Sequence, residues 1–350
     1  MTDPAILGQV KAYLAGRLAP EDAGDLVVTA VRQIARGVSR ETWRVEATSG
    51  RAGTEQARAY IIRCDYPGGV SVVAAELRFE YEVYLRLANS AVPVARPLWY
   101  DEHGIPGIID RPLYVREGVA GDWRVPHFRD PDPRWDELRV QTSKDHLNHL
   151  ALVHTCDYVS LGFRDIMPVP SGPEDAAVTA LRYHESRLRS VADQPIPLAE
   201  QALRRLYATA PATASSVGLC KGTNGLGEEI FTGGRLVAMS DWELAIIGDP
   251  AYDWAQLQDF VPTVVRDGRQ VWGEPQALAY YESVSGIHVE PATIDWYRAL
   301  NSLVKFTYAQ NAVRALRAGL NGSVRLAWVA TEVRYRSERA LAAIAEIGAS

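Results

Sequence analysis

Cysteine is scarce in this chain of 350 residues, which contains only Cys64, Cys156 and Cys220. These separations match no metal-binding spacing, and an odd number of cysteines cannot form a fully paired disulfide framework. A reducing compartment such as the cytoplasm is therefore the simpler expectation. In the first 18 residues an acidic residue precedes the apolar ones and polar positions interrupt them, so we expect no secretory signal there.

Long apolar runs and an excess of positive charge are also missing. No stretch approaches the roughly 18 uninterrupted apolar residues of a membrane helix. Lysine and arginine total 37 against 43 acidic residues, which gives a formal net charge of −6. This balance argues against a general binder of nucleic acid or of acidic membranes, although a local basic pocket for phosphates remains compatible with it. We expect neither nucleic acid nor membrane as a partner.

The most informative stretch is residues 217–254, in a chain whose 47% hydrophobic content is enough for large cores. Its sequence predicts a loop, a short strand, a turn at Gly233 and Gly234, and a second short strand. Asp241 follows that second strand. Asp249 and Asp253 come next, and we expect them to organise the following loop and the start of a helix.

This pattern resembles the C-terminal catalytic segment of the aminoglycoside phosphotransferase and choline kinase-like family. In that family a loop of the form H-G-D-x-x-x-x-N precedes a hairpin, and the next strand ends in I-D-W/F/L-E. SDWELAIIGDPAYDWA matches the second half. In the first half Lys221 replaces the His, Thr223 replaces the catalytic Asp, and Glu228 replaces the Asn. These three are the candidate catalytic residues.

Motifs in the first third of the chain extend the resemblance. Gly37, Ser39 and Thr42 match the family's phosphate loop, although an ordinary β-turn is the alternative interpretation. Arg63 occupies the position of the family's ATP-binding Lys, and Glu80 that of its ion-pairing helix Glu. The resemblance implies that this pair aims a cation at the nucleotide's phosphates, whereas Glu80 would otherwise be a solvated helix carboxylate.

The segment RPLYVREGVAGDW resembles the family's hinge, whose backbone groups bind the adenine edge. Arg116, Glu117 and Gly118 would be the hinge residues. The implied fold is α+β and protein-kinase-like, with two lobes. Residues 1–117 would form a β-rich lobe with a leading helix, an antiparallel sheet and one further helix, and residues 118–350 a helical lobe.

Helical periodicity predicts several further elements. An apolar stripe predicts an amphipathic helix over residues 4–18. Residues 136–163 predict one long helix, in which His154 is expected to be structural. Residues 174–210 predict two helices broken near Pro195 and Pro197, and two long helices follow beyond residue 272.

The resemblance implies ATP and Mg²⁺ as cofactors. Asp241 and Glu228 would be the metal ligands, because carboxylate oxygens suit this hard cation, and a turn or N-cap role is the alternative for Asp241. Thr223 cannot accept a proton as a carboxylate does, and general-base catalysis is typically worth about 10²–10⁴-fold. Phosphoryl transfer nevertheless relies mainly on positioning and charge stabilisation.

Three hypotheses remain open for the altered loop. A phenol or carboxylate acceptor could need little base help, with Lys221 lowering its pKa or steadying the transferred charge. Glu228, Glu229 or a partner protein could supply the base. The protein could also bind nucleotide or ligand without catalysis, as a scaffold or partner subunit. We predict an ATP-dependent phosphotransferase acting on a small-molecule acceptor, and leave adenylyl transfer, a partner subunit and a homodimer open.

Overall fold

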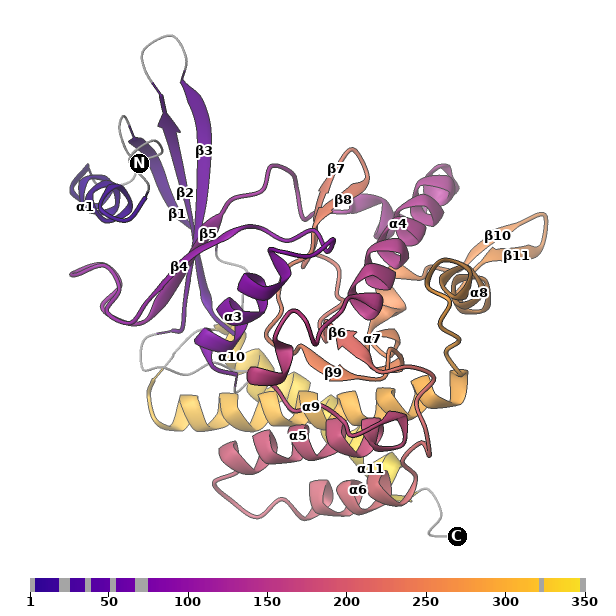
Figure 1. Ribbon diagram of the computed structural model, residues 1–350. Helices are drawn as coiled ribbons and strands as arrows, with labels where there is room; N and C mark the ends of the chain where they lie inside the picture. Colours follow the sequence, from indigo (N-terminus) through magenta and orange to yellow (C-terminus); the bar gives the residue numbers. More distant parts are fainter. Residues whose placement is uncertain are drawn as a thin grey trace.

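The computed structural model describes residues 4–18, 26–34, 39–50, 55–66, 75–320 and 324–346. A five-stranded antiparallel sheet in the order β1-β2-β3-β5-β4 forms the first lobe, and helices dominate the second (Figure 1). The predicted α+β architecture is therefore confirmed. The sheet consists of β1 (Val27–Gln33), β2 (Glu41–Ser49), β3 (Gln56–Cys64), β4 (Pro97–Asp101) and β5 (Leu113–Glu117).

Within the described ranges, two helices complete the sheet lobe. Helix α1 (Pro4–Ala15) buries Val10 and Leu14 in the core of this lobe, as its apolar stripe predicts. Helix α3 (Leu77–Leu87) begins after Glu76, which has an extended backbone, and its apolar face joins the core of the second lobe. Helix α3 therefore lies where the two lobes meet.

The described part of the helical lobe also contains three short antiparallel strand pairs. Strand β6 (Gly218–Cys220) pairs with β9 (Ile246–Gly248), and β7 (Ile230–Thr232) pairs with β8 (Arg235–Ala238). Strand β10 pairs with β11. The remaining elements are β10 (Val264–Arg266), β11 (Arg269–Trp272), α4 (Asp136–Thr155), α5 (Ala176–Val191), α6 (Pro197–Ala208), α7 (Ala251–Trp254), α8 (Glu274–Ser285), α9 (Pro291–Arg317), α10 (Val324–Trp328), a π-helical segment (Val329–Val333), α11 (Arg334–Glu346) and single 3₁₀ turns at Pro126–Phe128, Pro133–Trp135, Phe163–Asp165, Pro173–Asp175 and Leu257–Phe260.

Helix α4 is shorter than the sequence pattern predicts. It ends at Thr155, because Cys156 is extended with ψ 148°. The Asp157 side chain then accepts hydrogen bonds from the Ser160 N–H at 3.1 Å and from the Ser160 hydroxyl at 2.6 Å. Such local bonding offers the backbone an alternative to the helix, so the prediction that the helix continues to residue 163 is wrong.

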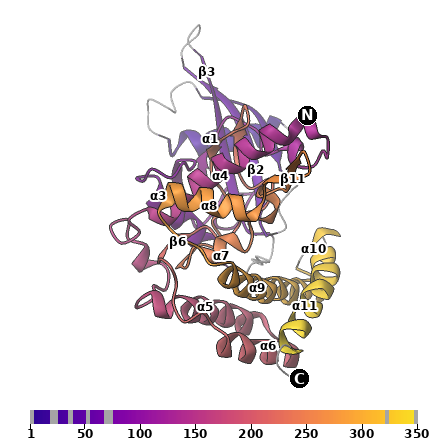
Figure 2. The same cartoon turned by 90° about the vertical axis from the view of Figure 1, so that its right-hand side faces the viewer.

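The helices predicted within residues 4–18 and 174–210 are present as α1, α5 and α6, whereas the second long helix predicted beyond residue 272 is divided into α10, the π-helical segment and α11. Pro197 opens α6, and the chain between α5 and α6 contains Pro195. Helix α9 has 27 residues and is therefore about 40 Å long. Figure 2 shows α10 and α11 beside α9 on one side of the helical lobe.

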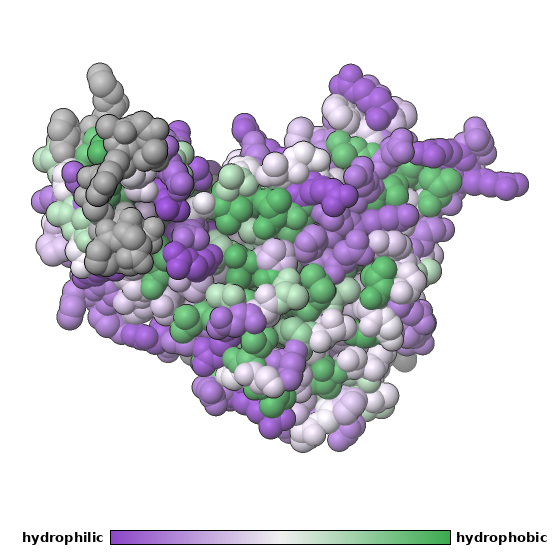
Figure 3. Space-filling model, turned by 45° about the horizontal axis from the view of Figure 1, so that its top comes forward, coloured by the Kyte–Doolittle hydropathy of each residue, from purple (hydrophilic) through white to green (hydrophobic). Residues whose placement is uncertain are grey.

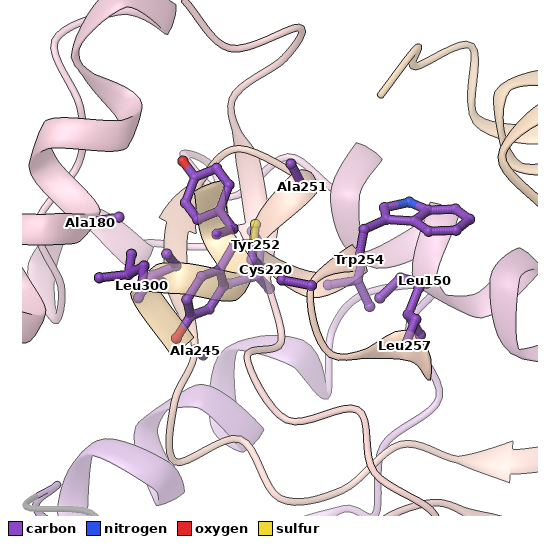
Figure 4. Close-up of a cluster of buried hydrophobic side chains, with 14 of the residues drawn as sticks. Leu150, Ala180, Cys220, Ala245, Ala251, Tyr252, Trp254, Leu257 and Leu300 are labelled. Atoms are coloured by element: carbon purple, nitrogen blue, oxygen red, sulfur yellow. The ribbon is translucent and has the colours of Figure 1, made fainter. Parts of the chain in front are cut away.

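A continuous core holds the helical lobe together around α7. Figure 4 shows Tyr252 and Trp254 of this short helix among Leu150, Cys220 and Leu257. Both aromatic side chains are 1% exposed. Fully burying a large apolar side chain is worth about 1.5–3 kcal/mol. This packing fixes α7 beside the strands that carry the altered loop.

The surface shows no continuous hydrophobic band on the face in Figure 3, where apolar side chains form patches among polar ones. Among the described residues, no helix combines the length and apolar character needed to cross a membrane.

Candidate active site

A cavity of ≈740 Å³ is lined by residues of both lobes. Its volume falls in the range of ligand pockets, about 300–1,000 Å³. The sheet lobe, the altered loop, and helices α9 and α11 all contribute to its walls. Gly37 lies outside the described residues, so its predicted role stays a prediction. Several predicted site residues line the cavity: Ser39, Arg63, Arg116, Glu228 and Asp241.

Arg63 on β3 joins carboxylates of both lobes. Its Nε donates to Glu80 Oε2 at 3.0 Å, and its Nη2 donates to Asp241 Oδ1 at 2.8 Å. The Arg63 side chain is only 12% exposed, so solvent screens these ion pairs weakly. Burial acts to lower the pKa of Arg63, but Glu80 and Asp241 raise it well above its ordinary value. Arg63 therefore pairs with Glu80, as predicted, and also with Asp241, the candidate metal ligand.

Arg40 and Glu243 complete this charged cluster. Arg40 is buried, and its Nη1 donates to Glu80 and Glu243 at 2.9 Å each, while its Nε donates to Asp65 at 2.9 Å. Burial and the charge of Asp241 raise the pKa of Glu243 to about 8, against the opposing effect of the guanidinium groups. In this cluster the carboxyl groups of Glu80, Asp241, Glu243 and Asp65 outnumber the guanidinium groups of Arg40 and Arg63. This excess of acidic groups suits the binding of a cation.

Asp241 has a left-handed backbone with φ 68°, which is uncommon for residues other than glycine. Two contacts hold it in this conformation. The Asp241 N–H donates to the hydroxyl of Tyr84 on α3 at 3.3 Å, and the Asp241 carbonyl accepts a hydrogen bond from the Thr223 hydroxyl. The structure thus maintains a strained backbone at the cavity wall, where strain frequently accompanies function.

Lys221 is fully buried and does not line the cavity. Its amine lies 3.1 Å from Glu229 Oε1 and 3.7 Å from Glu228 Oε2, and it donates to the carbonyl and hydroxyl of Thr223. Burial acts to lower the pKa of Lys221, but the two carboxylates raise it above its ordinary value. Lys221 therefore stabilises the loop from the protein interior. Thr223, also buried, is likewise absent from the cavity wall.

The consecutive glutamates occupy different environments. Glu229 is fully buried and lies 3.3 Å from His146 Nε2; burial acts to raise its pKa, but Lys221 lowers it. Glu228 is 28% exposed, lines the cavity, and accepts a hydrogen bond from the Gly225 N–H at 2.8 Å. Burial is the largest cause that raises the pKa of Glu228 to about 8. Glu228 is thus the acidic side chain of the loop that reaches the cavity.

Asp253 on α7 fixes the backbone of the altered loop. Its carboxylate accepts from the N–H groups of Lys221 at 2.7 Å and Gly222 at 2.6 Å, and from the Asn224 amide at 2.9 Å. The His154 ring lies 2.9 Å away. Burial acts to raise the pKa of Asp253, but these hydrogen bonds keep it below its ordinary value. His154 and Asp253 therefore position the loop and do not face the cavity.

The three predicted hinge residues separate in the structure. Arg116 lines the cavity, whereas Glu117 and Gly118 line a different surface groove. The Gly118 N–H donates to the Ala59 carbonyl at 2.7 Å, and the Glu117 carboxylate pairs with Arg96 at 2.7 Å. The Gly118 amide is therefore already engaged within the sheet lobe.

Sequence reasoning missed three features of the site. Arg40 follows Ser39 in a hairpin sequence. It was missed because the sequence around a buried arginine in such a hairpin does not differ from that around a solvated one. Glu243 could have been found, because it ends the DWE motif. The cavity wall that includes Lys305 and Arg336 depends on the packing of α9 against α11, and local sequence patterns do not reveal such packing.

The fold and this charged cleft define a protein with the architecture of a small-molecule kinase. The chain belongs to the phosphotransferase enzyme family, whose model matches residues 30–300. It is also similar to acyl-CoA dehydrogenase family member 11 of Rattus norvegicus, with 27% identity over 258 residues, 72% of this chain and 30% of that protein. The Mus musculus protein of the same name is 26% identical over 267 residues, 73% of this chain and 31% of its own length. The chain thus spans about three-tenths of these relatives.

Solved structures show the same fold. A Ralstonia eutropha protein described as an aminoglycoside phosphotransferase has a TM-score of 0.62 at 20% identity, covering 97% of this chain and 98% of its own. A thermostable mutant of aminoglycoside phosphotransferase APH(4)-Ia in a complex with ADP and hygromycin B has a TM-score of 0.55 at 16% identity, covering 98% and 99%. The kinase-like fold and the family resemblance seen in the sequence are confirmed.

Proposed function

We propose that this protein is an ATP- and Mg²⁺-dependent phosphotransferase that acts on a hydroxyl group of a small molecule. Asp241 carries the proposal, because its carboxylate lines the cavity and is tied through Arg63 to Glu80. Family membership supports the same chemistry. The solved complex of APH(4)-Ia with ADP and hygromycin B supports a nucleotide and a small-molecule acceptor.

The side chains present fit these ligands. Asp241 and Glu228 offer carboxylate oxygens, the ligands that Mg²⁺ prefers, and the bound cation would neutralise phosphate charge. Arg63 and Arg116 offer guanidinium groups that match phosphate oxygens. In the reaction the acceptor oxygen would bond to the γ-phosphorus while the bond from that phosphorus to the β–γ bridging oxygen breaks. ADP leaves, and the hydroxyl proton passes to water.

We assign Glu228 the role of an oxygen ligand in place of the family's Asn. The loose transition state of phosphoryl transfer needs little help from a base, which is consistent with Thr223 at the position of the catalytic Asp. Glu228→Gln keeps a ligand oxygen and should retain activity within about tenfold, whereas Glu228→Ala should lose more. A loss of about 10²–10⁴-fold in Glu228→Gln would instead identify Glu228 as the base.

The test is ADP release by the purified protein with ATP, Mg²⁺ and a panel of alcohols, amino alcohols, hydroxy acids and phenols. We expect at least one acceptor to stimulate turnover, and Asp241→Asn to abolish that stimulation. If no acceptor raises nucleotide consumption above the buffer rate, the proposed activity is wrong.

A second candidate is a nucleotide-binding module without catalysis. The observation in its favour is that the Thr223 hydroxyl, at the position of the catalytic Asp, bonds to the Asp241 carbonyl and does not line the cavity. This function predicts Mg²⁺-dependent nucleotide affinity together with the absence of turnover on every acceptor.

A further inference from the structure

One wall of the cavity comes entirely from the C-terminal part of the helical lobe. Figure 2 shows the helices that supply it, α9 and α11, next to each other. Ser302, Lys305 and Tyr308 are spaced three apart on α9 and therefore share a face. The end of α10, the π-helical segment and α11 supply the rest of this helical wall, and π-helical segments frequently occur at functional sites.

The charged groups on the helical wall are both cationic. Lys305 and Arg336 line the cavity, and within the described chain no carboxylate of α9, the π-helical segment or α11 lines it with them. Arg336 also pairs with Glu332 at 2.7 Å, outside the cavity wall. Lys305 has no ion-pair partner within 4.0 Å in the part of the protein that the structure describes. The carboxylates of the cavity, by contrast, come from the altered loop and the segment of Asp241.

A second polar group on this wall lacks a partner. The Tyr308 hydroxyl is buried, and among described residues it makes no hydrogen bond. An unpaired buried hydroxyl is destabilising, because it has lost its hydrogen bonds to water. A ligand oxygen in the cavity would remove that cost.

Apart from Ser302 and Ser337, the remainder of the helical wall is apolar. Val329, Val333 and Ala340 line the cavity, and so does Trp328, which is 53% exposed. A half-exposed tryptophan beside a cavity offers a flat apolar surface that a ligand body can cover. The helical wall thus combines an unpaired cation, an unpaired hydroxyl and an apolar surface.

We infer that the phosphoryl acceptor is an acidic small molecule: a hydroxyl-bearing carboxylic or other acid with an apolar body, held on the helical wall. Lys305, with Arg336, binds its acidic group, Trp328 and Val333 contact its body, and its hydroxyl faces Asp241. This inference rests on the proposed function and specifies its substrate. A polycationic acceptor such as an aminoglycoside would instead meet the positive charge of this wall.

The test uses matched acceptors in which one group is anionic, neutral or cationic: hydroxybenzoate, hydroxybenzamide and hydroxybenzylamine, and ω-hydroxy acids with their amides and amino alcohols. Their affinities are measured by calorimetry in the presence of Mg²⁺ and AMP-PNP. We expect each preferred acid to bind about tenfold more tightly than its amide, and still more tightly than its amine. Lys305→Gln should remove this preference, while Lys11→Gln, on the exposed side of α1, should keep it.

Neutral or cationic partners that bind as tightly as the acids would overturn the inference, and so would the absence of binding by every acid. The proposed function fails separately. If AMP-PNP does not bind but an acid still binds through Lys305, the acidic-ligand site stands and the phosphotransferase proposal falls. If nucleotide is consumed with amino alcohols in preference to acids, the phosphotransferase proposal stands and the inference of an acidic acceptor falls.

Discussion

Arg63 donates a hydrogen bond to Asp241 at 2.8 Å and thereby connects the sheet lobe to the helical lobe across the cavity. The same guanidinium binds Glu80, so its two ends are held by carboxylates from different lobes. A metal ion bound to Asp241 would have to share this carboxylate with Arg63 or displace it. The relative position of the lobes and the proposed nucleotide site are therefore coupled through one side chain.

The first prediction concerns this side chain. Arg63→Met removes the charge that is offered to the phosphates and should weaken ATP binding by more than about tenfold. Arg63→Lys keeps the charge without the planar fork and restores the residue type expected from the resemblance, so its affinity should stay within about tenfold. Titration calorimetry of both variants checks this, with thermal melting as the control for folding. Wild-type affinity in Arg63→Met would contradict it.

The second prediction concerns the buried amine of the altered loop. Lys221→Met leaves Glu229 buried without its cation, which should destabilise the protein by about 3–5 kcal/mol. The double variant Lys221→Met, Glu229→Gln removes both charges and should recover part of that loss. Urea unfolding measures both. A double variant that is less stable than Lys221→Met would show that the charge pair is not the cause.

The third prediction is a pH dependence that originates at His184. The His184 ring is buried and lies 3.0 Å from the Tyr252 hydroxyl, and burial lowers its pKa to about 3. As the pH falls, the His184 ring takes up a proton in the unfolded chain before it does so in the folded protein. The stability that the neutral ring contributes above pH 6.5 is therefore lost as the pH falls toward 3. Between pH 6.5 and 5 this group should cost about 2 kcal/mol. Urea unfolding at both values measures the loss.

His184→Gln should flatten this acid loss, whatever its stability at neutral pH. His288 provides a control of opposite sign, because hydrogen bonds with the exposed carboxylates Glu282 and Glu290 raise its pKa. The stability contributed by protonated His288 is present below pH 6.5 and is lost as the pH rises through the raised pKa of this residue. His288→Gln should therefore not flatten the acid loss, and an equal flattening in both variants would refute the assignment to His184.

The fold was largely predictable from the sequence, because its signals are local. The stripe of Val10 and Leu14 gave α1, and Pro197 marked the start of α6. The end of α4 was missed because an Asx-type turn at Asp157 competes with a helix whose side-chain pattern continues. Propensity cannot decide between two local structures when side-chain hydrogen bonds favour one of them.

The site was predictable where a motif fixed it and not where packing did. Arg63, Glu80 and Asp241 were identified by resemblance and lie together. The burial of Lys221 could not be predicted, because its environment comes from the folded arrangement of Glu229, Thr223 and Trp242 around its amine. Lys305 was missed for the same reason, since only the docking of α9 and α11 places it on the cavity wall.

The most direct test of the account is titration of ATP into the wild-type protein with and without Mg²⁺, and into Asp241→Ala. We predict binding by the wild type that depends on Mg²⁺ and is lost in Asp241→Ala, with both proteins equally folded by thermal melting. Absence of ATP binding under every condition, or Mg²⁺-dependent affinity that is unchanged in Asp241→Ala, would contradict the assignment of this cavity as a metal-dependent nucleotide site.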